Sequence, residues 1–529
     1  MGHCSVNITY EKRPLFVCEY SHSMGNSCGD LKRYWDIFDS NDRFCGGCIW
    51  EWADHAIRLH TEDAVPYDGY GGDFGEAVHQ GNLCADGLTT PDRVPHSALL
   101  EAKQIYAPVK IQHTGIDGVI RLTNRCHTDD LCNMILNWEI WWEGSTIQNG
   151  EIRDIRISPG AAAEFVLPYQ TDGLCGEAYL NIEIALANQT LWAPAGYVLY
   201  QWQYKLMVPE KKVAAKNAVH SFSTRETPSF FDIMGSQWRY RISRETGMIE
   251  QIWMKNVPLF QEPLRFAIWR APIDNDRFVR QIWEKPNGEN YQHLLTQALD
   301  VQLQKNDSHQ VEIMVPFQIG VTGRRPLIAG KLLYIVKKEG ILGISLHGIV
   351  RQHLPTWLPR FGLQWRLTKD LNEITFYGMG PGESYVDKHL SARMGLYHTT
   401  PEKMQPYYLR PQESGSIWQT HFCELRQKNA LGLQIAGGPF SLNVSHYTPE
   451  ELTRAKHPYE LQRSGSLIVH TDYFMSGIGS ASVGPELEEQ YRLSSGEICF
   501  QLGVTPLEQG GSTGFDRMRE IQEVLNGIS

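Results

Sequence analysis

An ionisable side chain ends an apolar run close to the start of the chain. Glu19 directly follows the run from Leu15 to Cys18, and His22 stands three residues further on. At the end of a buried strand a desolvated carboxylate can act as a nucleophile or as an acid and base, and a nearby histidine can bind substrate hydroxyls. The structural alternative is that Glu19 pairs with an arginine or lysine beneath a loop. The pattern favours chemistry, because perturbed carboxylates cluster at functional sites.

A second group of aromatic and acidic residues follows the next apolar run. Trp50, Glu51, Trp52 and Asp54 come directly after residues 45–49. An indole face can stack on the C–H face of a sugar ring, so this segment resembles a sugar platform. Ordinary packing inside a barrel explains the same residues equally well, and both interpretations stay open.

These residues need strands and a helix to position them. The run before Glu19 and the run from Cys45 to Trp52 lack polar alternation, which is typical of parallel strands covered on both faces. In a (β/α)8 barrel the catalytic groups stand at the carboxyl ends of such strands. A lone pair of these strands would leave unpaired edges and exposed apolar surface. Between the two runs, apolar residues recur at helical spacing: Leu31, Tyr34, Trp35 and Phe38.

The remainder of the chain is predicted to be mostly β-structure. Short alternating segments predict an immunoglobulin-like β-sandwich, and a later region dominated by strands predicts a large β-sandwich. The last residues predict one amphipathic helix, with a loosely attached tail as the alternative. The fold class is therefore multidomain, α/β plus all-β. The predicted domains are a partial barrel at 1–106, the immunoglobulin-like sandwich at 107–207, a linker at 208–229, the large sandwich at 230–507 and a C-terminal helix or tail at 508–529.

Composition excludes several classes of function. A formal charge of -11 offers nucleic acid no electrostatic attraction. No run of about 18 apolar residues and no signal peptide are present, so neither membrane insertion nor secretion is expected. The 11 cysteines lack the spacing of a disulfide scaffold, which indicates a reduced, cytoplasmic setting. Cys45 and Cys48 have CxxC spacing, but they lie in a predicted buried strand, so strand packing is favoured over metal or redox chemistry.

Several longer motifs run through the chain. They are Cys18-Glu-Tyr-Ser-His-Ser-Met-Gly-Asn26, Gly46-Gly-Cys-Ile-Trp-Glu-Trp-Ala-Asp54, Tyr70-Gly-Gly-Asp-Phe-Gly75, Cys84-Ala-Asp-Gly87, Arg270-Ala-Pro…Asp274-Asn-Asp276 and Arg410-Pro-Gln-Glu413. Together they closely resemble the lac-type β-galactosidases of glycoside hydrolase family two, and the resemblance extends to about Pro506. It implies the last two βα units of a (β/α)8 barrel, an immunoglobulin-like domain and a large β-sandwich of the small-chain type.

The resemblance also implies roles for individual residues. Glu19 matches the catalytic nucleophile, which forms a covalent galactosyl-enzyme intermediate with retention of configuration. His22 and Trp50 match residues that contact galactose. Glu413 matches a residue on a β-domain loop near the active site, and is expected to contribute to substrate binding.

Metal ions are implied in the same way. Leu83, through its backbone carbonyl, and Asp86 match the ligands of a monovalent site for Na⁺ or K⁺. Family members commonly have asparagine where Asp86 stands, so the affinity of this site is expected to differ. Mg²⁺ is expected for the family, but its main ligands are absent from this chain, and His79 stands where some members use an asparagine near a second magnesium ion.

The largest departure from the family lies before Glu19. In the family, two β-domains and six barrel units precede the nucleophile strand, and the acid/base glutamate belongs to the fourth of those units. A retaining glycosidase needs two carboxyl groups about 5–5.5 Å apart, and only one is identifiable here. Substitution of the missing acid by Glu51, Asp54 or Asp73 is a remote alternative, because the geometry must be held within about an ångström.

Two hypotheses follow. The first is a β-galactosidase component that hydrolyses terminal β-D-galactosides such as lactose and is incomplete as this chain alone. Its acid/base would come from an N-terminal β-galactosidase portion or large chain, and an oligomer is expected. The second is a catalytically silent galactoside-binding or interaction protein derived from such an enzyme.

Overall fold

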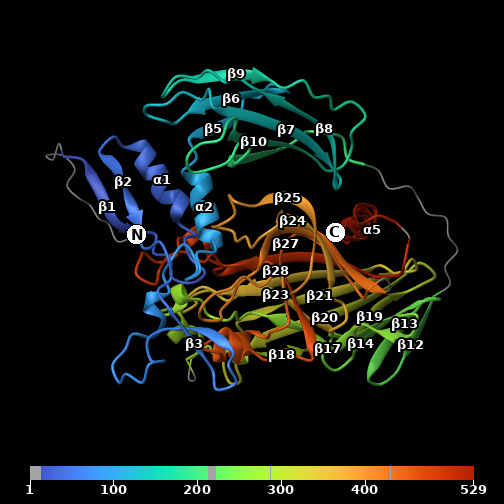
Figure 1. Cartoon of the computed structure of the whole chain (residues 1–529). Helices are drawn as coiled ribbons and strands as arrows, with labels where there is room; N and C mark the ends of the chain where they lie inside the picture. The colour runs from blue at the N-terminus through green and yellow to red at the C-terminus, as the bar shows by residue number, and fades with distance from the viewer. Residues whose placement is uncertain (1–12, 212–221, 286–287, 429–430, 511, 529) are drawn as a thin grey trace. The chain divides into compact units, whose positions relative to one another are not determined.

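The computed structural model describes residues 13–211, 222–285, 288–428, 431–510 and 512–528. The chain divides into two compact units, Leu99–Ala214 and the combination of Met1–Ala98 with Ala215–Ser529. Strands are the main regular secondary structure of both units (Figure 1). No helix in the described part of the chain combines the length and apolar character needed to cross a membrane.

The predicted strand–helix–strand unit near the start of the chain is confirmed. It consists of β1 (Leu15–Tyr20), α1 (Leu31–Ser40) and β2 (Phe44–Ile49). The two strands pair in parallel, with Cys18 opposite Cys48. Helix α1 buries Leu31 and Phe38, two of the apolar residues at helical spacing. The carboxyl ends of both strands therefore lie at the same edge of the small sheet.

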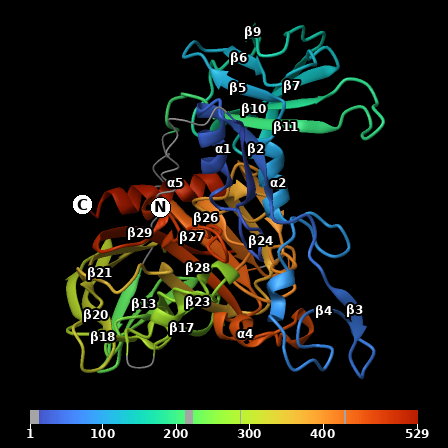
Figure 2. The same ribbon diagram turned by 90° about the vertical axis from the view of Figure 1, so that its left-hand side faces the viewer.

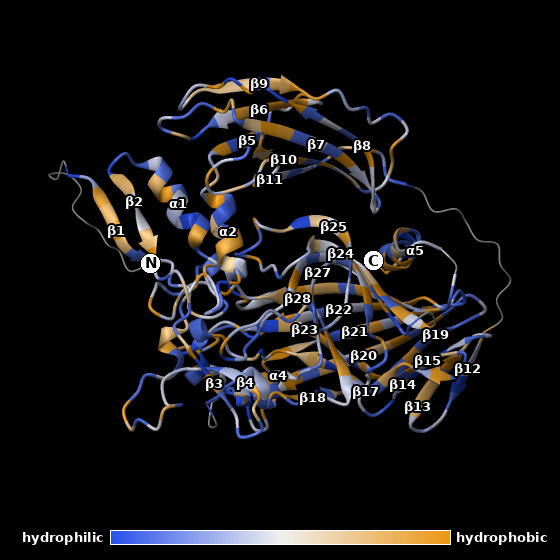
Figure 3. Cartoon of the chain, viewed as in Figure 1, coloured by the Kyte–Doolittle hydropathy of each residue, from blue (hydrophilic) through white to orange (hydrophobic). Residues whose placement is uncertain are grey.

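Both strands are more exposed than their apolar sequences predict. Within the described residues β1 and β2 form a sheet of two strands only. Phe16, Cys45 and Cys48 are exposed, so the prediction that packing in a buried strand accounts for the CxxC pair is wrong for this chain. The physical reason is that no further strand among the described residues packs beside them. The expected unpaired edges and apolar surface are confirmed, and Figure 3 shows the apolar character of both strands.

Loops and short elements follow β2 in the chain. They include a hairpin of β3 (Ile57–His60) and β4 (Pro66–Gly69), and the 3-10 helix η1 (Gly81–Cys84). Helix α2 (Ser97–Ile105) follows and crosses the boundary between the two units.

The unit at Leu99–Ala214 is a sandwich of two antiparallel sheets. Ile120 and Leu122 from one sheet and Leu136 and Ile182 from the other share one buried core. Its topology as an immunoglobulin-like domain stays a prediction. One sheet contains β5 (Val109–His113), β6 (Val119–Asn124) and β9 (Ala162–Val166), and the other contains β7 (Met134–Trp142), β8 (Ser145–Ile152), β10 (Ala178–Leu186) and β11 (Val198–Lys205).

The later part of the chain forms a sheet of five strands and a large sheet of 13 strands, whose buried faces share one core. The prediction that strands dominate this region is confirmed. The five strands are β12 (Ser223–Glu226), β13 (Phe230–Met234), β14 (Trp238–Ser243), β15 (Ile249–Met254) and β16 (Val257–Pro258). The large sheet contains β17 (Phe260–Ala267), β18 (Leu295–Ala298), β19 (Gln302–Asn306), β20 (Gln310–Gly320), β21 (Ile328–Lys337), β22 (Leu342–Val350), β23 (Arg360–Thr368), β24 (Glu373–Gly380), β25 (Arg393–Thr399), β26 (Ile417–Arg426), β27 (Gly432–Ser445), β28 (Ser466–Met475) and β29 (Gly496–Leu507). Short helices connect them: η2 (Asp274–Asp276), α3 (Arg280–Trp283), η3 (Tyr291–His293), α4 (Pro449–Arg454), η4 (Pro458–Glu460) and η5 (Glu489–Tyr491).

Both ends of this region differ from, or refine, the sequence prediction. The predicted linker 208–229 includes residues 212–221, which lie outside the described residues. Strand β12 falls within the predicted linker, but it pairs with β13 and so belongs to the sheet of five strands. At the other end α5 (Gly514–Asn526) is a helix packed on β27 and β29, as Figure 2 shows. Its Phe515, Ile521 and Leu525 are buried, so this segment is an attached helix and not a loose tail.

Candidate active site

Glu19 lies at the end of β1, as predicted, but its side chain is exposed. Among the residues that the structure describes, none forms a hydrogen bond or ion pair with its carboxylate. The alternative of an ion pair beneath a loop is therefore not observed. The desolvation expected at a covered strand end is also not present in this chain, since β2 is the only described strand that pairs with β1. The carboxylate is open to any molecule that reaches this edge of the sheet.

His22 is buried three residues after Glu19 and is held between two side chains. Its Nδ1 lies 3.0 Å from the Ser482 Oγ, and its Nε2 lies 3.7 Å from the Asp86 Oδ2. Burial lowers the pKa of His22, and the positive charge of Arg277 lowers it further. The imidazole is therefore neutral at physiological pH and offers one donor and one acceptor.

The indole ring of Trp50 lies beside Asp86, which also contacts His22. Its Nε1 donates a hydrogen bond of 3.0 Å to the Asp86 Oδ2, while 46% of the residue stays exposed. The backbone of Glu51 binds the same loop, because its N–H donates to the carbonyl of Asp86 at 2.7 Å. An indole fixed at its nitrogen and open on its ring suits stacking against a sugar.

Asp86 has the environment of a cation ligand. Burial raises its pKa to about 7, a hydrogen bond and the charge of Glu51 add to the rise, and the Trp50 N–H opposes it. Its Oδ1 is buried without a hydrogen-bond partner among the described residues. An unpaired buried carboxylate oxygen fits a hard cation that prefers oxygen ligands. Leu83, in η1 three residues earlier, is the residue predicted to add a backbone carbonyl.

The three carboxylates considered as substitute acids hold loops in place instead. Asp54 is buried, with its Oδ2 3.0 Å from the His96 Nε2. The Asp73 Oδ1 lies 3.1 Å from the His457 Nε2. Glu51 has its Oε1 3.4 Å from His55 Nδ1. None of these contacts involves Glu19, so the structure does not support the hypothesis that Glu51, Asp54 or Asp73 replaces the missing acid/base residue.

Glu413 reaches the site through its backbone and not through its carboxylate. Its carbonyl accepts a hydrogen bond of 3.0 Å from the Asn26 Nδ2. The buried carboxylate faces the interior of the large sheet, where Oε2 lies 3.5 Å from the Arg360 Nη1 and Oε1 accepts from Ser416 and Asn443 at 2.9 and 3.3 Å. The backbone of Glu413 therefore lies at the predicted site, whereas its carboxylate points away from it.

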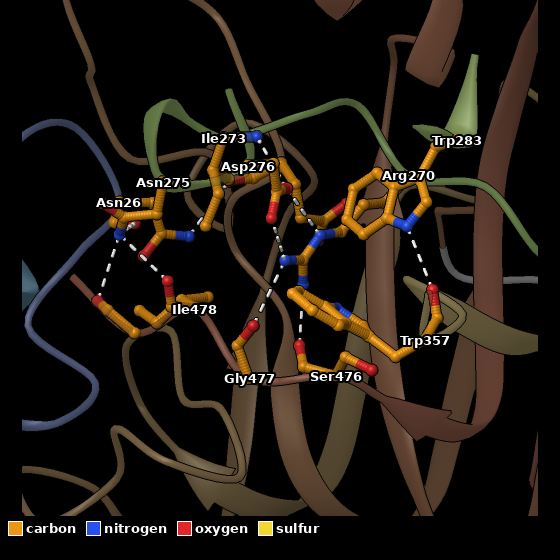
Figure 4. A network of polar contacts seen from close by, with 12 residues as sticks. Asn26, Arg270, Ile273, Asn275, Asp276, Trp283, Trp357, Ser476, Gly477 and Ile478 are labelled. Carbon is orange, nitrogen blue, oxygen red and sulfur yellow. Dashed lines mark hydrogen bonds and ion pairs between the residues drawn. The ribbon is translucent and has the colours of Figure 1, made fainter. Parts of the chain in front are cut away.

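A buried arginine fixes the start of the loop after β28, and Ser482 lies further along this loop. The Arg270 guanidinium donates to both Asp276 carboxylate oxygens, at 3.1 and 2.9 Å, and to the carbonyls of residues 476 and 477 at 2.7 and 3.2 Å (Figure 4). A guanidinium whose donors are all aimed at fixed acceptors makes a rigid anchor.

Asn275 connects this anchor to the loop after β1. Its Nδ2 donates to the carbonyl of Ile478 at 2.9 Å and to the Ser27 Oγ at 3.1 Å, and it lies between Asn26 and Ile478 in Figure 4. Its Oδ1 accepts from the backbone N–H of Ser482 at 2.9 Å. The loop at 270–276 is thus structural, and it positions the hydroxyl that contacts His22.

Three family models match the chain. The model described as β-galactosidase small chain matches residues 234–504. The chain belongs to the β-galactosidase small-chain family. The model of the TIM barrel domain of glycosyl hydrolases family 2 matches residues 4–111, and that of β-galactosidase domain 4 matches residues 120–207.

Curated relatives of this small-chain family member are longer than the chain. A β-galactosidase of Actinobacillus pleuropneumoniae is 37% identical over 94% of this chain and 48% of its own length. A β-galactosidase of Staphylococcus xylosus is 30% identical over 93% of this chain and 49% of its own length. The chain therefore spans about half the length of these relatives. Among solved structures, a galactose 1-epimerase of Lactobacillus acidophilus aligns with 55% of this chain and 99% of its own at 8% identity, with a TM-score of only 0.29.

We expect Asp30, at the start of α1, to make the stability of the chain depend on pH. Its carboxylate accepts hydrogen bonds from the hydroxyls of Ser21 and Ser480. Burial raises its pKa to about 6 and the nearby Asp387 adds to the rise, while the two hydroxyls oppose it. Because this pKa lies above the unfolded value, the folded state keeps a proton that the unfolded state releases from about pH 4 upward. The stabilisation is full below that pH and is lost as the pH rises through about 6.

Replacing Asp30 by asparagine should flatten this dependence. The free energy of unfolding of the unmodified chain should fall between about pH 4 and 7 by up to roughly 3 kcal/mol more than that of Asp30→Asn. Urea unfolding at several pH values measures the difference. Asp36→Asn on the exposed face of α1, where Asp36 pairs with Lys32, should keep the unmodified profile. Identical profiles for Asp30→Asn and the unmodified chain would contradict this assignment.

Proposed function

We propose that this chain is a component of a retaining β-galactosidase that hydrolyses terminal β-D-galactosides such as lactose. The observation that carries the proposal is the placement of Glu19 and Trp50 at the carboxyl ends of two neighbouring parallel strands, with the neutral His22 beside them. Membership of the β-galactosidase small-chain family supports it. The named relatives that span about twice this length are β-galactosidases.

In the proposed reaction Glu19 is the nucleophile. Its carboxylate attacks the anomeric carbon of the galactoside, the bond to the leaving oxygen breaks, and a second carboxylic acid gives that oxygen a proton. Water then attacks the same carbon, gives its proton to the second carboxylate, and releases Glu19 and galactose with retained configuration. The second carboxyl group comes from the polypeptide that supplies the other barrel strands.

The open side of the small barrel sheet supports such a partner. A cavity of about 1210 Å³ borders β1 and α1, and Phe16, Ile37 and Leu487 are among the residues that line it. Phe16 and Ile37 are exposed there, and β1 has one unpaired edge among the described elements. A further parallel strand and its helix would cover this surface and desolvate Glu19.

For the monovalent cation, Asp86 and the backbone carbonyl of Leu83 are the residues that would hold Na⁺ or K⁺. The bound ion would supply a positive charge beside Trp50, the proposed sugar contact. The buried, unpaired Oδ1 of Asp86 is consistent with this assignment.

An assay of the chain alone and in a mixture tests the proposal. The partner is the half of the Actinobacillus pleuropneumoniae relative that this chain does not match, and the substrate is an aryl β-galactoside. We expect no hydrolysis by either part and hydrolysis by the mixture. Turnover by the chain alone would overturn the requirement for a second polypeptide.

Binding of a galactoside without hydrolysis is the second candidate function. The exposed indoles of Trp50 and Trp52, at 46% and 61%, favour it, since they can bind a sugar without any second carboxylate. Binding of a galactoside by the chain, with no hydrolysis by any mixture, would select this alternative.

Trp50→Ala should weaken galactoside binding about 10-fold, equivalent to about 1.4 kcal/mol, because the stacking surface is lost. The KM of the mixture, or the Kd of the chain for an aryl galactoside, measures the effect. Trp52→Ala is the matched control. Trp52 is also exposed, but no described residue forms a hydrogen bond with its ring nitrogen, so its effect should be several-fold smaller. Equal losses in the two variants would contradict a specific role for Trp50.

A further inference from the structure

Three side chains that can bind metal meet on the outer face of the large sheet, away from the residues described above. His347 on β22 lies directly opposite Cys499 on β29 in the antiparallel register. Glu497 precedes Cys499 by two residues and so points to the same face of the sheet. The imidazole, thiol and carboxylate ligand atoms all lie within 4.8 Å of one another, and the His347 Nε2 contacts the Glu497 Oε1.

The three donors differ in chemistry, which distinguishes them from an ordinary acidic cluster. One nitrogen, one sulfur and one oxygen suit a borderline-soft divalent ion of the zinc class, whereas Ca²⁺ and Mg²⁺ prefer oxygen alone. Bond lengths of about 2.0–2.3 Å in a tetrahedral site place neighbouring donors roughly 3.3–3.7 Å apart. The side chains of His347 and Glu497 are 54% and 65% exposed, so small rotations about their own bonds can close the remaining distance.

The backbone beneath these side chains is fixed. β22 pairs along its length with β21 on one side and β29 on the other, so His347 stands on an interior strand. Cys499 is held opposite it by the same ladder. No other group of three His, Cys, Asp or Glu side chains with this spacing occurs in the described part of the chain.

We infer that His347, Glu497 and Cys499 form a binding site for one divalent ion of the zinc class, with water in the fourth position. Binding breaks the contact between His347 and Glu497 and releases the thiol proton of Cys499 to solvent, while the ion gains a thiolate. The inference does not depend on the proposed glycosidase activity, because no residue of that site takes part.

The CxxC pair of β2 cannot make a comparable site. Cys45 and Cys48 are both on β2, and among the described residues no group of three metal-binding side chains includes either of them. These exposed cysteines are nevertheless potential sources of a stray metal signal, and they provide a control. Lys331 provides another. It lies opposite His347 on β21, and an ammonium group gives the ion no ligand.

Titration of the intact, reduced chain with Co²⁺ tests the inference. We expect a thiolate-to-cobalt absorption band that saturates at one ion per chain and disappears on addition of Zn²⁺. Cys499→Ala should abolish the band, and His347→Ala should lower the affinity at least about 10-fold. Lys331→Ala and the double variant Cys45→Ala/Cys48→Ala should leave the band and the affinity unchanged.

Thermal unfolding checks that each variant is folded. All these positions are exposed, so the variants should unfold at the temperature of the unmodified chain. Absence of the thiolate band in the unmodified chain would overturn the inference. So would a band that persists in folded Cys499→Ala.

Discussion

Replacing Glu19 by glutamine is expected to lower kcat of the completed enzyme at least about 10³-fold on an aryl β-galactoside. The amide is close in size to the carboxylate but cannot attack the anomeric carbon, so the covalent intermediate does not form. KM should change little, because His22 and Trp50, the proposed contacts of the sugar, are unchanged. Steady-state kinetics of the mixture described above measure both constants.

Glu62→Gln is the matched control for this experiment. Glu62 is an exposed glutamate between the hairpin strands β3 and β4, and it shows no ion-pair partner among the described residues. Its replacement should leave kcat within about two-fold of the unmodified value. Retention of more than a tenth of the activity by Glu19→Gln would show that another group is the nucleophile.

The second large effect is expected in the interior of the large sheet. Arg360 is fully buried and pairs with the carboxylates of Asp472 and Glu413. Burial raises the pKa of Glu413, and the charge of Arg360 opposes that rise. Arg360→Ala leaves two buried carboxylates without their cation, which should cost about 3–5 kcal/mol of the free energy of unfolding. Urea unfolding of the chain at neutral pH measures the loss.

Arg366→Ala separates this effect from the loss of any arginine on the same strand. Arg366 also lies on β23 and pairs with Glu262 at 2.7 Å, but Glu262 is partly exposed to water. Such a pair contributes about 1 kcal/mol or less. Losses of similar size in the two variants would mean that the buried ion pairs of Arg360 have no special weight.

Local sequence patterns predicted the elements near the site well. An apolar run that ends in Glu19, helical spacing from Leu31 to Phe38 and a second apolar run define β1, α1 and β2, because side-chain period and strand length are local properties. The C-terminal helix was predictable for the same reason. The exposure of Cys45 and Cys48 was not, since an uninterrupted apolar run indicates burial in a complete sheet, whatever polypeptide supplies the neighbouring strands.

Local sequence patterns could not predict the contacts between residues that are distant in sequence and that position the site. Ser482 contacts His22 across 460 residues of sequence, and nothing in the residues around it indicates that contact. The inward carboxylate of Glu413, on the loop before β26, depends on Arg360, which is 53 residues away on β23. The polar residues of the loop at 270–276 could be recognised as structural from the sequence. The backbone carbonyls that they bind could not be predicted.

The proposed mechanism requires that Glu19 becomes covalently attached to galactose. A 2-deoxy-2-fluoro-galactoside with a good leaving group slows hydrolysis of such an intermediate and traps it. Digestion of the treated mixture and mass spectrometry should find the fluorosugar on the peptide containing Glu19, and no label when the chain is treated alone. A label on a different carboxylate, such as Glu51, or full turnover of galactosides by a mixture in which Glu19 is never labelled, would contradict the account.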